Sequence, residues 1–547
     1  MKMTGYTCKY TPIELISAFS EKCVFLGEEA ENFEYSQALT HSNFCTHAKA
    51  LIEEVHRKNI RSLVLVNCCD SVRRVYDVLK GSLDFVFLLD LPHDDNECAV
   101  QRLAAQLERL AGEYSSFCGK TFSRTAFFDA FEDEKGLSDE KYIAVAGARA
   151  GEQFLKTAQA RMPFKTVDMT CSGNRHVGQI PDEGDFSALM LMYARSILSQ
   201  MPCMRMTGIS ARENMFNDEN CAGIIYHTVK FCDYYDFDFQ RVAKASRIPV
   251  LKIETDFTTQ AAGQLSTRFE GFSEGFSSSG QKKETAARNP SGSLYAGIDS
   301  GSTTTNFVAF DKNGKIAASS VVRTGANAAA GAQKAIEAAG IDSSELAYTV
   351  ATGYGRKNIT LANESITEIT CHAKGARFLN ADADTIIDIG GQDSKIIRLN
   401  PDGSVKGFSM NDKCAAGTGR FLENMAKVLE ISIDEMAIRG IKYDNDLTIS
   451  SMCTVFAESE VVSLIAENVS IPDIIHALNK SVAAKTKSLL GKLEQENTLI
   501  MTGGVANNLG VVSEIEKLVG KPVLIPEHPE LCGALGAALF ALEKGQA

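Results

Sequence analysis

The segment that decides the fold runs from Asp388 to Glu460. It contains DIGGQDSK at residues 388–395, NDKCAAGTGRF at 411–421 and SSMCTVFAESEVVSL at 450–464. The first motif follows an apolar strand that ends at Asp388, and its two glycines let the backbone turn sharply and present amides to a phosphate. This pattern predicts one half of a nucleotide site.

Two cysteines in the same segment each precede a run of helical character. Cys414 is followed by FLENMAKVL and Cys453 by FAESEVVSLIAE. A thiolate near a helix N-terminus is favoured by the helix dipole, which lowers the thiol pKa. We therefore expect nucleotide chemistry to be coupled to a centre that is bound by thiolates.

Two further glycine-rich turns lie on either side of this segment. YAGIDSGSTTTNFVAF at 295–310 is typical of a strand, a turn and a returning strand, and LIMTGGVANN at 499–508 of a strand that turns into a helix. A Walker loop, which needs GxxxxGK before a helix, is absent from these turns. Two hairpin turns and a late GG turn in this order indicate the duplicated actin, sugar-kinase and heat-shock ATPase fold.

The turns supply candidate residues for ATP or ADP and Mg²⁺. Asp299 and Asp388 are expected to face each other and hold Mg²⁺ through water, and Gln392 or Asp393 to orient an attacking water. The alternative for each aspartate alone is a side chain that caps its turn. The predicted nucleotide-binding residues are Gly301, Ser302, Thr303, Thr304, Gly390, Gly391, Asp393, Gly503, Gly504 and Asn507.

The residues before this ATPase unit alternate between short apolar strands and helical runs, which predicts two small, flavodoxin-like domains with parallel sheets. Cysteines follow several of the strands, at the sheet edge where functional residues gather. Residues 274–293 hold Ser, Gly, Lys and Pro with few apolar residues, which predicts a flexible linker. The predicted domains are 1–140, 141–273 and 294–547.

Composition narrows the range of partners. The chain has 547 residues and a formal net charge of −13, which argues against nucleic acid or an anionic membrane as a partner. The N-terminus lacks a signal-like apolar core, so we expect a cytoplasmic protein. In a reducing compartment the fifteen cysteines are expected to be metal ligands or buried small side chains rather than disulfides.

Residues 295–547 resemble the activators of 2-hydroxyacyl-CoA dehydratases, called archerases, and the ATPase subunits of benzoyl-CoA reductase. The resemblance rests on GIDSGSTTT, DIGGQDSK, NDKCAAGTGRFLE, SMCTVFAESE and TGGVANN. It implies a homodimer in which Cys414 and Cys453 of each subunit hold one shared [4Fe-4S] cluster. Two isolated cysteines cannot complete a four-thiolate site in one chain, which also favours a two-fold axis.

Residues before the linker resemble the catalytic subunits of these dehydratases and the related double-cubane cluster proteins. The matching segments include FCTHAKAL, NCCDSVRRVYDVL and YHTVKFCDYYDFDF, and they imply that Cys45, Cys69 and Cys232 hold a [4Fe-4S] cluster. Adding Cys8, Cys171 and Cys203 gives the six cysteines of a double-cubane cluster. The sequence leaves the nuclearity of this cluster open. The region is shorter than a free-standing dehydratase subunit, which argues against dehydration by this chain alone.

We therefore predict an ATP-hydrolysing activase that transfers electrons at low potential. The resemblance implies ferredoxin or flavodoxin as the donor, and as the acceptor an iron-sulfur cluster in the N-terminal module or a separate dehydratase or reductase. The alternatives are an ATPase that assembles or repairs clusters and a small-molecule kinase of the same fold.

Overall fold

The computed structural model describes residues 3–132, 140–207, 218–259, 262–276, 289, 291–412, 415–449, 454–491 and 497–546. These residues form two compact units, Met1–Glu270 and Gly271–Ala547, and each is described by itself. In the described ranges, none of the helices is both long and apolar enough to cross a membrane.

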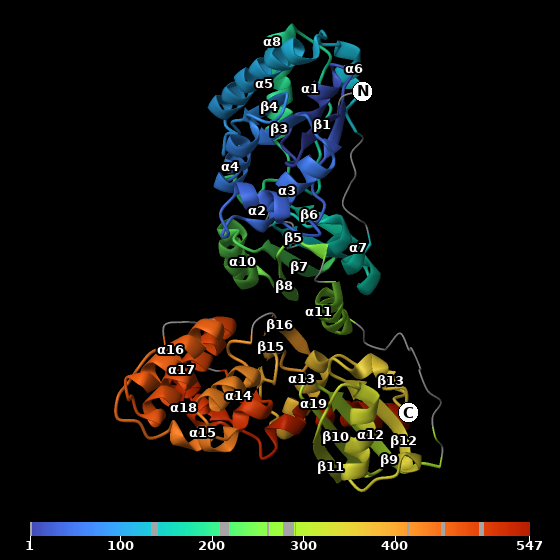
Figure 1. Cartoon of the computed structure of the whole chain (residues 1–547). Helices are drawn as coiled ribbons and strands as arrows, with labels where there is room; N and C mark the ends of the chain where they lie inside the picture. The colour runs from blue at the N-terminus through green and yellow to red at the C-terminus, as the bar shows by residue number, and fades with distance from the viewer. Residues whose placement is uncertain are drawn as a thin grey trace. The chain divides into compact units, whose positions relative to one another are not determined.

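The first unit contains two four-stranded sheets whose strands are all parallel (Figure 1). One sheet has the order β2-β1-β3-β4 and the other β6-β5-β7-β8. Their strands are β1 (Met3–Tyr6), β2 (Lys22–Phe25), β3 (Ser62–Val66), β4 (Phe85–Leu89), β5 (Tyr142–Gly147), β6 (Lys165–Thr170), β7 (Cys221–Val229) and β8 (Val250–Thr255). Every residue of β3 is buried, as expected for a strand covered on both faces.

Helices cover both sheets of this unit. They are α1 (Ile13–Ser17), α2 (Glu34–Leu39), α3 (Thr46–Arg57), α4 (Asp70–Leu79), α5 (Glu97–Cys118), α6 (Arg124–Phe128), α7 (Glu152–Arg161), α8 (Phe186–Leu198), α10 (Asp233–Ala245) and α11 (Ala262–Glu274). The helix α8 leaves the second sheet and packs against α5, in the core of the first sheet. The chain therefore crosses between the two sheets before α8 and returns after it.

The second unit is built from two sheets with the same pattern of strand directions. In the order β11-β10-β9-β12-β13, β9 is antiparallel to β10 and parallel to β12. In the order β16-β15-β14-β17-β18, β14 is likewise antiparallel to β15 and parallel to β17. This repeated topology confirms the predicted duplicated ATPase fold.

Each sheet of the second unit begins with one of the two hairpins that the sequence predicts, β9–β10 and β14–β15. The strands are β9 (Leu294–Ser300), β10 (Thr304–Phe310), β11 (Ile316–Arg323), β12 (Leu346–Thr352), β13 (Glu364–Ser365), β14 (Thr385–Ile389), β15 (Ser394–Leu399), β16 (Val405–Asn411), β17 (Leu499–Thr502) and β18 (Val523–Leu524). The helices are α12 (Ala328–Ala338), α13 (Glu368–Leu379), α14 (Gly419–Val428), α15 (Ile433–Arg439), α16 (Thr454–Ala466), α17 (Ile471–Leu490), α18 (Leu509–Val519) and α19 (Cys532–Gln546), with short 3₁₀ turns η2 (Ser343–Glu345), η3 (Arg356–Asn358), η4 (Gly504–Asn507) and η5 (Pro529–Leu531).

Candidate nucleotide site and cysteine centre

The three glycine-rich turns of the second unit meet in space. A Cβ added to Gly391 would lie 2.2 Å from the hydroxyl of Thr303, so the tips of the two hairpins are in contact. A Cβ added to Gly503 would lie 2.4 Å from the carbonyl oxygen of Ile389, which places the third turn against the second. Gly503 also has a φ of +82°, a conformation that glycine adopts without strain.

Asp299 and Asp388 occupy corresponding positions in the two halves of the duplication. In the first sheet, Asp299 of β9 pairs with Thr352 at the end of β12. In the second, Asp388 of β14 pairs with Thr502 at the end of β17. The two carboxylates therefore come from equivalent strand ends, as the sequence predicts.

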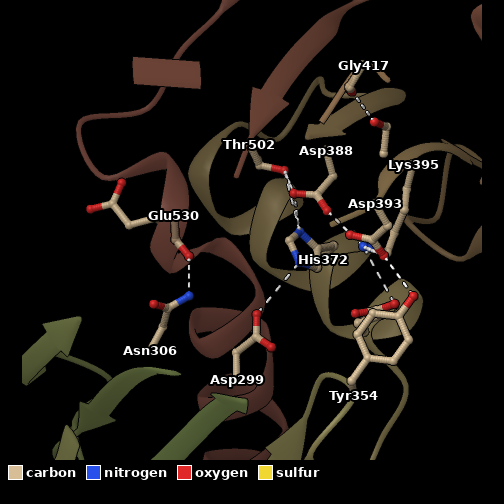
Figure 2. A network of polar contacts seen from close by, with 12 residues as sticks. Asp299, Asn306, Tyr354, His372, Asp388, Asp393, Lys395, Gly417, Thr502 and Glu530 are labelled. Carbon is tan, nitrogen blue, oxygen red and sulfur yellow. Dashed lines mark hydrogen bonds and ion pairs between the residues drawn. The ribbon is translucent and has the colours of Figure 1, made fainter. Parts of the chain in front are cut away.

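His372 lies between these two carboxylates, as Figure 2 shows. Its Nε2 is 3.9 Å from Asp299 and its Nδ1 is 3.6 Å from Asp388. The hydroxyl of Thr502 donates a hydrogen bond of 2.9 Å to Asp388. The two aspartates thus face one central group, and all three side chains are buried.

A buried lysine, Lys395, joins the second hairpin to the same network (Figure 2). Its Nζ is 2.7 Å from Asp393, 3.3 Å from Asp388 and 3.5 Å from Glu368. The hydroxyl of Tyr354 donates to Asp393 over 3.2 Å. Asp393 is therefore fixed by two partners within the protein.

Burial and charge act in opposite directions on the acids of this network. Burial raises the pKa of Asp299, and His372 and Lys395 only partly offset it. Burial also acts to raise the pKa of Asp388, but His372, Lys395 and the hydrogen bond from Thr502 outweigh it and lower the pKa. Burial raises the pKa of Glu368 to about 8. Asp388 is therefore the more readily ionised of the two aspartates, and paired carboxylates of this kind suit a small, oxygen-seeking cation such as Mg²⁺.

The other predicted nucleotide residues line the turns themselves. Gln392 and Ser302 are exposed at the tips of the two hairpins, and Gly504 and Asn507 are exposed on η4. Thr303 and Thr304 are half-buried beside Gly301. The carbonyl oxygens of Gly390 and Gly391 accept hydrogen bonds from backbone amides at the start of α14. The role of these residues in nucleotide binding stays a prediction.

The second hairpin is tied directly to the helix that follows Cys414. The carbonyl oxygens of Gly390 and Gly391 accept hydrogen bonds of 2.9 Å and 2.8 Å from the backbone amides of Gly419 and Arg420, at the start of α14. The hydroxyl of Ser394 donates to the carbonyl oxygen of Gly417 over 2.5 Å. Cys414 and Cys453 themselves lie outside the described residues.

In the first unit, the cysteines are found where strands end and helices begin. Cys45, Cys69 and Cys232 each occupy the position just before a helix, namely α3, α4 and α10. Cys8 lies two residues after the end of β1, and Cys171 directly follows β6. Cys203 lies in the loop after α8, so Cys171 and Cys203 flank the crossing between the sheets.

The predicted six cysteines are distributed over the two hydrophobic cores of the first unit and influence one another electrostatically. Burial and the nearby thiols of Cys203 and Cys8 raise the pKa of Cys171 to about 12. Burial and the thiol of Cys45, followed by those of Cys171 and Cys69, raise the pKa of Cys232. Cys8 and Cys203 lie in one hydrophobic core of the first unit, Cys45, Cys69 and Cys232 lie in or against the other, and Cys171 packs against both.

A buried ion pair joins the loops that carry Cys8 and Cys171. The guanidinium of Arg175 donates hydrogen bonds of 2.7 Å and 2.6 Å to the two carboxylate oxygens of Glu14, and one of 3.1 Å to the carbonyl oxygen of Thr11. Tyr193 of α8 donates to the same carboxylate over 2.6 Å. This contact fixes the spacing of the two loops.

The thiol set fits an iron-sulfur centre better than a single metal ion. Within the described ranges, no three His, Cys, Asp or Glu side chains are arranged to hold one ion. One ion draws thiolates to about 2.3 Å from a single point, whereas the cysteines of a cubane bind different irons and lie further apart. A small, partly open pocket beside Cys171 and Cys203 is lined also by Lys9, Gly147 and Asn174.

Several residues of both centres have no role in the sequence prediction. His372, Glu368 and Thr502 come from segments far from the hairpins, and only the fold brings them to the aspartates. Lys395 lies inside the DIGGQDSK motif, so the sequence could have indicated that this lysine belongs to the site. Cys68 precedes Cys69 and packs against both hydrophobic cores of the first unit.

Comparison with known proteins separates the two halves of the chain. Residues 296–541 match the model of the BadF/BadG/BcrA/BcrD ATPase family, and residues 8–142 and 143–276 match that of the 2-hydroxyglutaryl-CoA dehydratase D-component. The chain is 47% identical over 253 residues to the activator of lactoyl-CoA dehydratase from Anaerotignum propionicum, covering 46% of this chain and 98% of that protein. The chain belongs to the BadF/BadG/BcrA/BcrD ATPase family.

Other members of this ATPase family align over the same share of the chain. The (R)-2-hydroxyglutaryl-CoA dehydratase activating ATPase of Acidaminococcus fermentans is 40% identical and covers 46% of this chain and 98% of its own length. A solved structure, the activator of the 2-hydroxyisocaproyl-CoA dehydratase from Clostridium difficile with bound ADPNP, is 39% identical, covers 46% of this chain and 96% of that chain, and has a TM-score of 0.44. The protein thus joins a dehydratase-type module and an ATPase of the activator type in one polypeptide.

Proposed function

We propose that this chain is an ATP-dependent electron-transfer protein that works at low potential. The observation that carries the proposal is the set of hydrogen bonds from the Gly390–Gly391 turn to the start of α14, next to Cys414. A change of nucleotide at this turn would act on the helix that adjoins the cysteine. The names of the relatives, which are dehydratase activators, support the same function.

In the ATPase half, Asp299 and Asp388 would hold Mg²⁺, and the turn amides at residues 301–303 and 390–392 would hold the phosphates of ATP. Lys395 keeps Asp388 and Asp393 in place and stabilises their charge. Gln392, which is exposed at the hairpin tip, would orient the attacking water. Because the site is buried around the aspartates, these electrostatic contacts are weakly screened.

Cys414 and Cys453 would hold a [4Fe-4S] cluster shared by two copies of the chain. The cluster supplies one-electron redox chemistry, with a potential set by its exposure and hydrogen bonding. Phe456, Val462 and Ile465 of α16, which begins directly after Cys453, are 65%, 53% and 41% exposed. An exposed apolar face beside the cysteine fits a second copy of the chain across a two-fold axis.

The cysteine centre of the N-terminal unit would receive the electron, or would stand beside a separate dehydratase that does. Cys8, Cys45, Cys69, Cys171, Cys203 and Cys232 would hold this second iron-sulfur centre. Ferredoxin or flavodoxin is the proposed donor. We propose that residues 1–140 and 141–273 form the two domains of the N-terminal module, and that residues 294–547 form the ATPase domain after a linker.

The variant Ser394→Ala tests the proposed coupling between nucleotide and cluster. It removes the hydrogen bond to Gly417 but leaves both aspartates, so we expect near-normal ATP hydrolysis. The change that MgATP causes in the EPR spectrum of the reduced cluster should be strongly diminished. Ser409→Ala, on the neighbouring strand β16, is the matched control and should retain the full change.

A normal EPR response in Ser394→Ala would contradict the proposed route from the hairpin to the cluster. Transfer of iron from the wild-type protein to an apo-protein, in place of reversible reduction, would instead favour an assembly ATPase.

A further inference from the structure

Arg149 is a buried arginine at the edge of the second sheet where the parallel strands of that sheet end. Its side chain is 6% exposed, and it follows β5 by two residues. The amide of Cys171, directly after β6, donates a hydrogen bond of 3.0 Å to the carbonyl oxygen of Gly147, the last residue of β5. Arg149 and Cys171 therefore leave the sheet from neighbouring strand ends.

The guanidinium of Arg149 lies against the segment that follows β2 of the first sheet. Its Nη2 donates a hydrogen bond of 3.1 Å to the carbonyl oxygen of Gly27, and its Cζ is 3.9 Å from the centre of the Phe25 ring. A Cβ added to Gly27 would lie 1.4 Å from Nη2, so only glycine leaves room for the guanidinium. Arg149 thus reaches the edge of the first sheet at which Cys8 and Cys69 follow their strands.

The chain around this arginine belongs to the same core as most of the cysteines. The residues just before the arginine and before its glycine seat, Ala148 and Leu26, are both fully or almost fully buried in that core. Three of the six predicted ligands pack against the same core, namely Cys69, Cys171 and Cys232. The guanidinium is therefore held among the strand ends that carry the cysteine centre.

Two N–H groups of Arg149 have no acceptor in the part of the chain that the structure describes. Its Nε and Nη1 are both buried and form no hydrogen bond with a described residue. The two acids that follow Gly27 have other partners: Glu28 pairs with basic residues at the end of α3, and Glu29 accepts from backbone amides at the start of α7. Arg175 of the same unit, by contrast, meets a carboxylate through both terminal nitrogens.

A buried guanidinium in this state needs an anion. The group stays protonated at neutral pH, and a charge without a partner in a protein interior is strongly unfavourable. Because the described residues offer Arg149 no carboxylate, the missing partner is an anion that the protein binds. A cubane held by thiolates is such an anion, and its sulfur atoms accept hydrogen bonds.

We propose that Arg149 is the counter-charge of the N-terminal iron-sulfur centre, to whose sulfur atoms its Nε–H and Nη1–H groups donate. The inference rests on the proposed function, because it requires a cluster in this unit. Reduction adds one electron, and so one negative charge, to the cluster; Arg149 keeps its proton and no covalent bond changes. Positive charge and hydrogen bonds stabilise the reduced form more than the oxidised form, so Arg149 raises the reduction potential. A higher potential suits this centre to receive the electron from the ATPase half.

The experiment uses the full chain with Cys414→Ala and Cys453→Ala, so that all remaining iron belongs to the N-terminal centre. The protein is titrated without oxygen against applied potential, and the EPR signal gives the ratio of reduced to oxidised cluster. Arg149→Gln removes the charge, and Arg149→Lys keeps it. The controls are Phe25→Leu, which removes the ring beside the guanidinium, and Arg161→Gln, which makes the same change of charge at the far end of α7.

At the midpoint potential of the background protein, the reduced-to-oxidised ratio of Arg149→Gln should be about tenfold lower, as expected for one partly screened charge. This is a downward shift of about 59 mV. Arg149→Lys should recover most of the shift, and both controls should match the background. Equal midpoints for Arg149→Gln and the background would overturn the proposal, and so would an equal shift in Phe25→Leu, because lost packing would then explain it. Absence of iron from the background would instead overturn the proposed N-terminal centre, so the two failures are distinct.

A second measurement does not depend on iron uptake by Arg149→Gln. The background protein is made with arginine that carries ¹⁵N in the guanidinium group, and pulsed EPR of the reduced cluster detects ¹⁵N nuclei hydrogen-bonded to it. We expect a ¹⁵N coupling in the background that is lost from iron-loaded Arg149→Lys. No coupling in the background, or a coupling that persists in Arg149→Lys, would show that Arg149 does not donate to the cluster and would leave a soluble anion as its partner.

Discussion

At the scale of the residue, the centres combine groups that the sequence places and groups that only the fold brings together. Asp299 and Asp388 could be predicted because each lies near the end of an apolar strand, before a glycine-rich turn. His372 could not, because it lies within a helix and nothing local to it indicates that it faces both aspartates.

The variant Asp388→Asn should abolish most ATP hydrolysis. Asparagine keeps the shape of the side chain but removes the charge that faces Lys395 and His372. We expect kcat to fall about 100-fold or more, the cost of losing one preorganised electrostatic group, with the fold retained. Phosphate release measures the effect, and Asp382→Asn, at an exposed site before β14, is the control. If Asp388→Asn hydrolysed ATP at the wild-type rate, Asp388 would not be part of the catalytic site.

Acid should weaken the N-terminal unit through His227. Its ring is fully buried, with Nδ1 3.1 Å from the carbonyl oxygen of Ala148 and Nε2 2.9 Å from the hydroxyl of Thr255. Burial lowers the pKa of His227 from 6.5 to about 4, so the fold prefers the neutral ring. The stabilisation is complete above pH 6.5 and is lost as pH falls through about 4, amounting to about 3 kcal/mol.

Hydrogen exchange of β7 and β8 peptides, corrected for the intrinsic rate at each pH, measures this loss in the metal-free protein. The His227→Gln variant has no proton to bind and should lose less protection between pH 6.5 and pH 4 than the wild type does. Equal pH dependence in the two proteins would show that His227 is not the source.

At the scale of the element, the sequence predicted the strands with strong apolar patterns and missed the weak ones. The short apolar strands predicted before the linker are present, β3 to β8 among them, and both hairpins of the ATPase half form within the predicted motifs. The strands β1 and β2 have four residues each and a mixed pattern of burial, so they carry little periodic signal. The placement of Cys203 was not predictable, because it follows α8, and spacing does not encode the packing of α8 against α5 in the core of the first sheet.

The turn at Gly503 should tolerate no side chain. A Cβ there would meet the carbonyl oxygen of Ile389 at 2.4 Å, and its φ of +82° disfavours any other residue. Gly503→Ala should therefore cost about 1–3 kcal/mol in stability and reduce ATP affinity. Gly504→Ala is the matched control, since nothing lies within 4 Å of its added Cβ. Thermal unfolding and nucleotide binding should distinguish the two neighbours; equal behaviour would contradict the close packing of this turn.

At the scale of the whole molecule, the chain is two compact units, and the first residues of the second unit, Gly271–Ala547, carry a detail that composition did not reveal. Glu274 ends α11, and its carboxylate accepts hydrogen bonds from the amide of Thr367 at 3.0 Å and the hydroxyl of Thr370 at 2.5 Å. The polar composition of residues 274–293 predicted a linker. The contact of Glu274 with α13 could not be predicted, because one residue produces no periodic pattern in the sequence.

A fragment of residues 271–547 should therefore be more stable than a fragment of residues 291–547. The longer fragment retains Glu274 and its bonds to the start of α13, worth about 1–3 kcal/mol. Thermal unfolding measures the difference, and Glu274→Gln in the longer fragment should remove much of it. Equal midpoints for the two fragments would show that α13 does not depend on this contact.

The most direct test of the account is one measurement on the whole chain. Protein purified without oxygen is assayed for iron and sulfide, and the EPR spectrum of the dithionite-reduced sample is recorded with and without MgATP. We predict iron well above two atoms per chain and a spectrum that changes when MgATP is added. Absence of iron, or a spectrum that is indifferent to MgATP, would contradict the coupling of an ATPase to iron-sulfur centres in this protein.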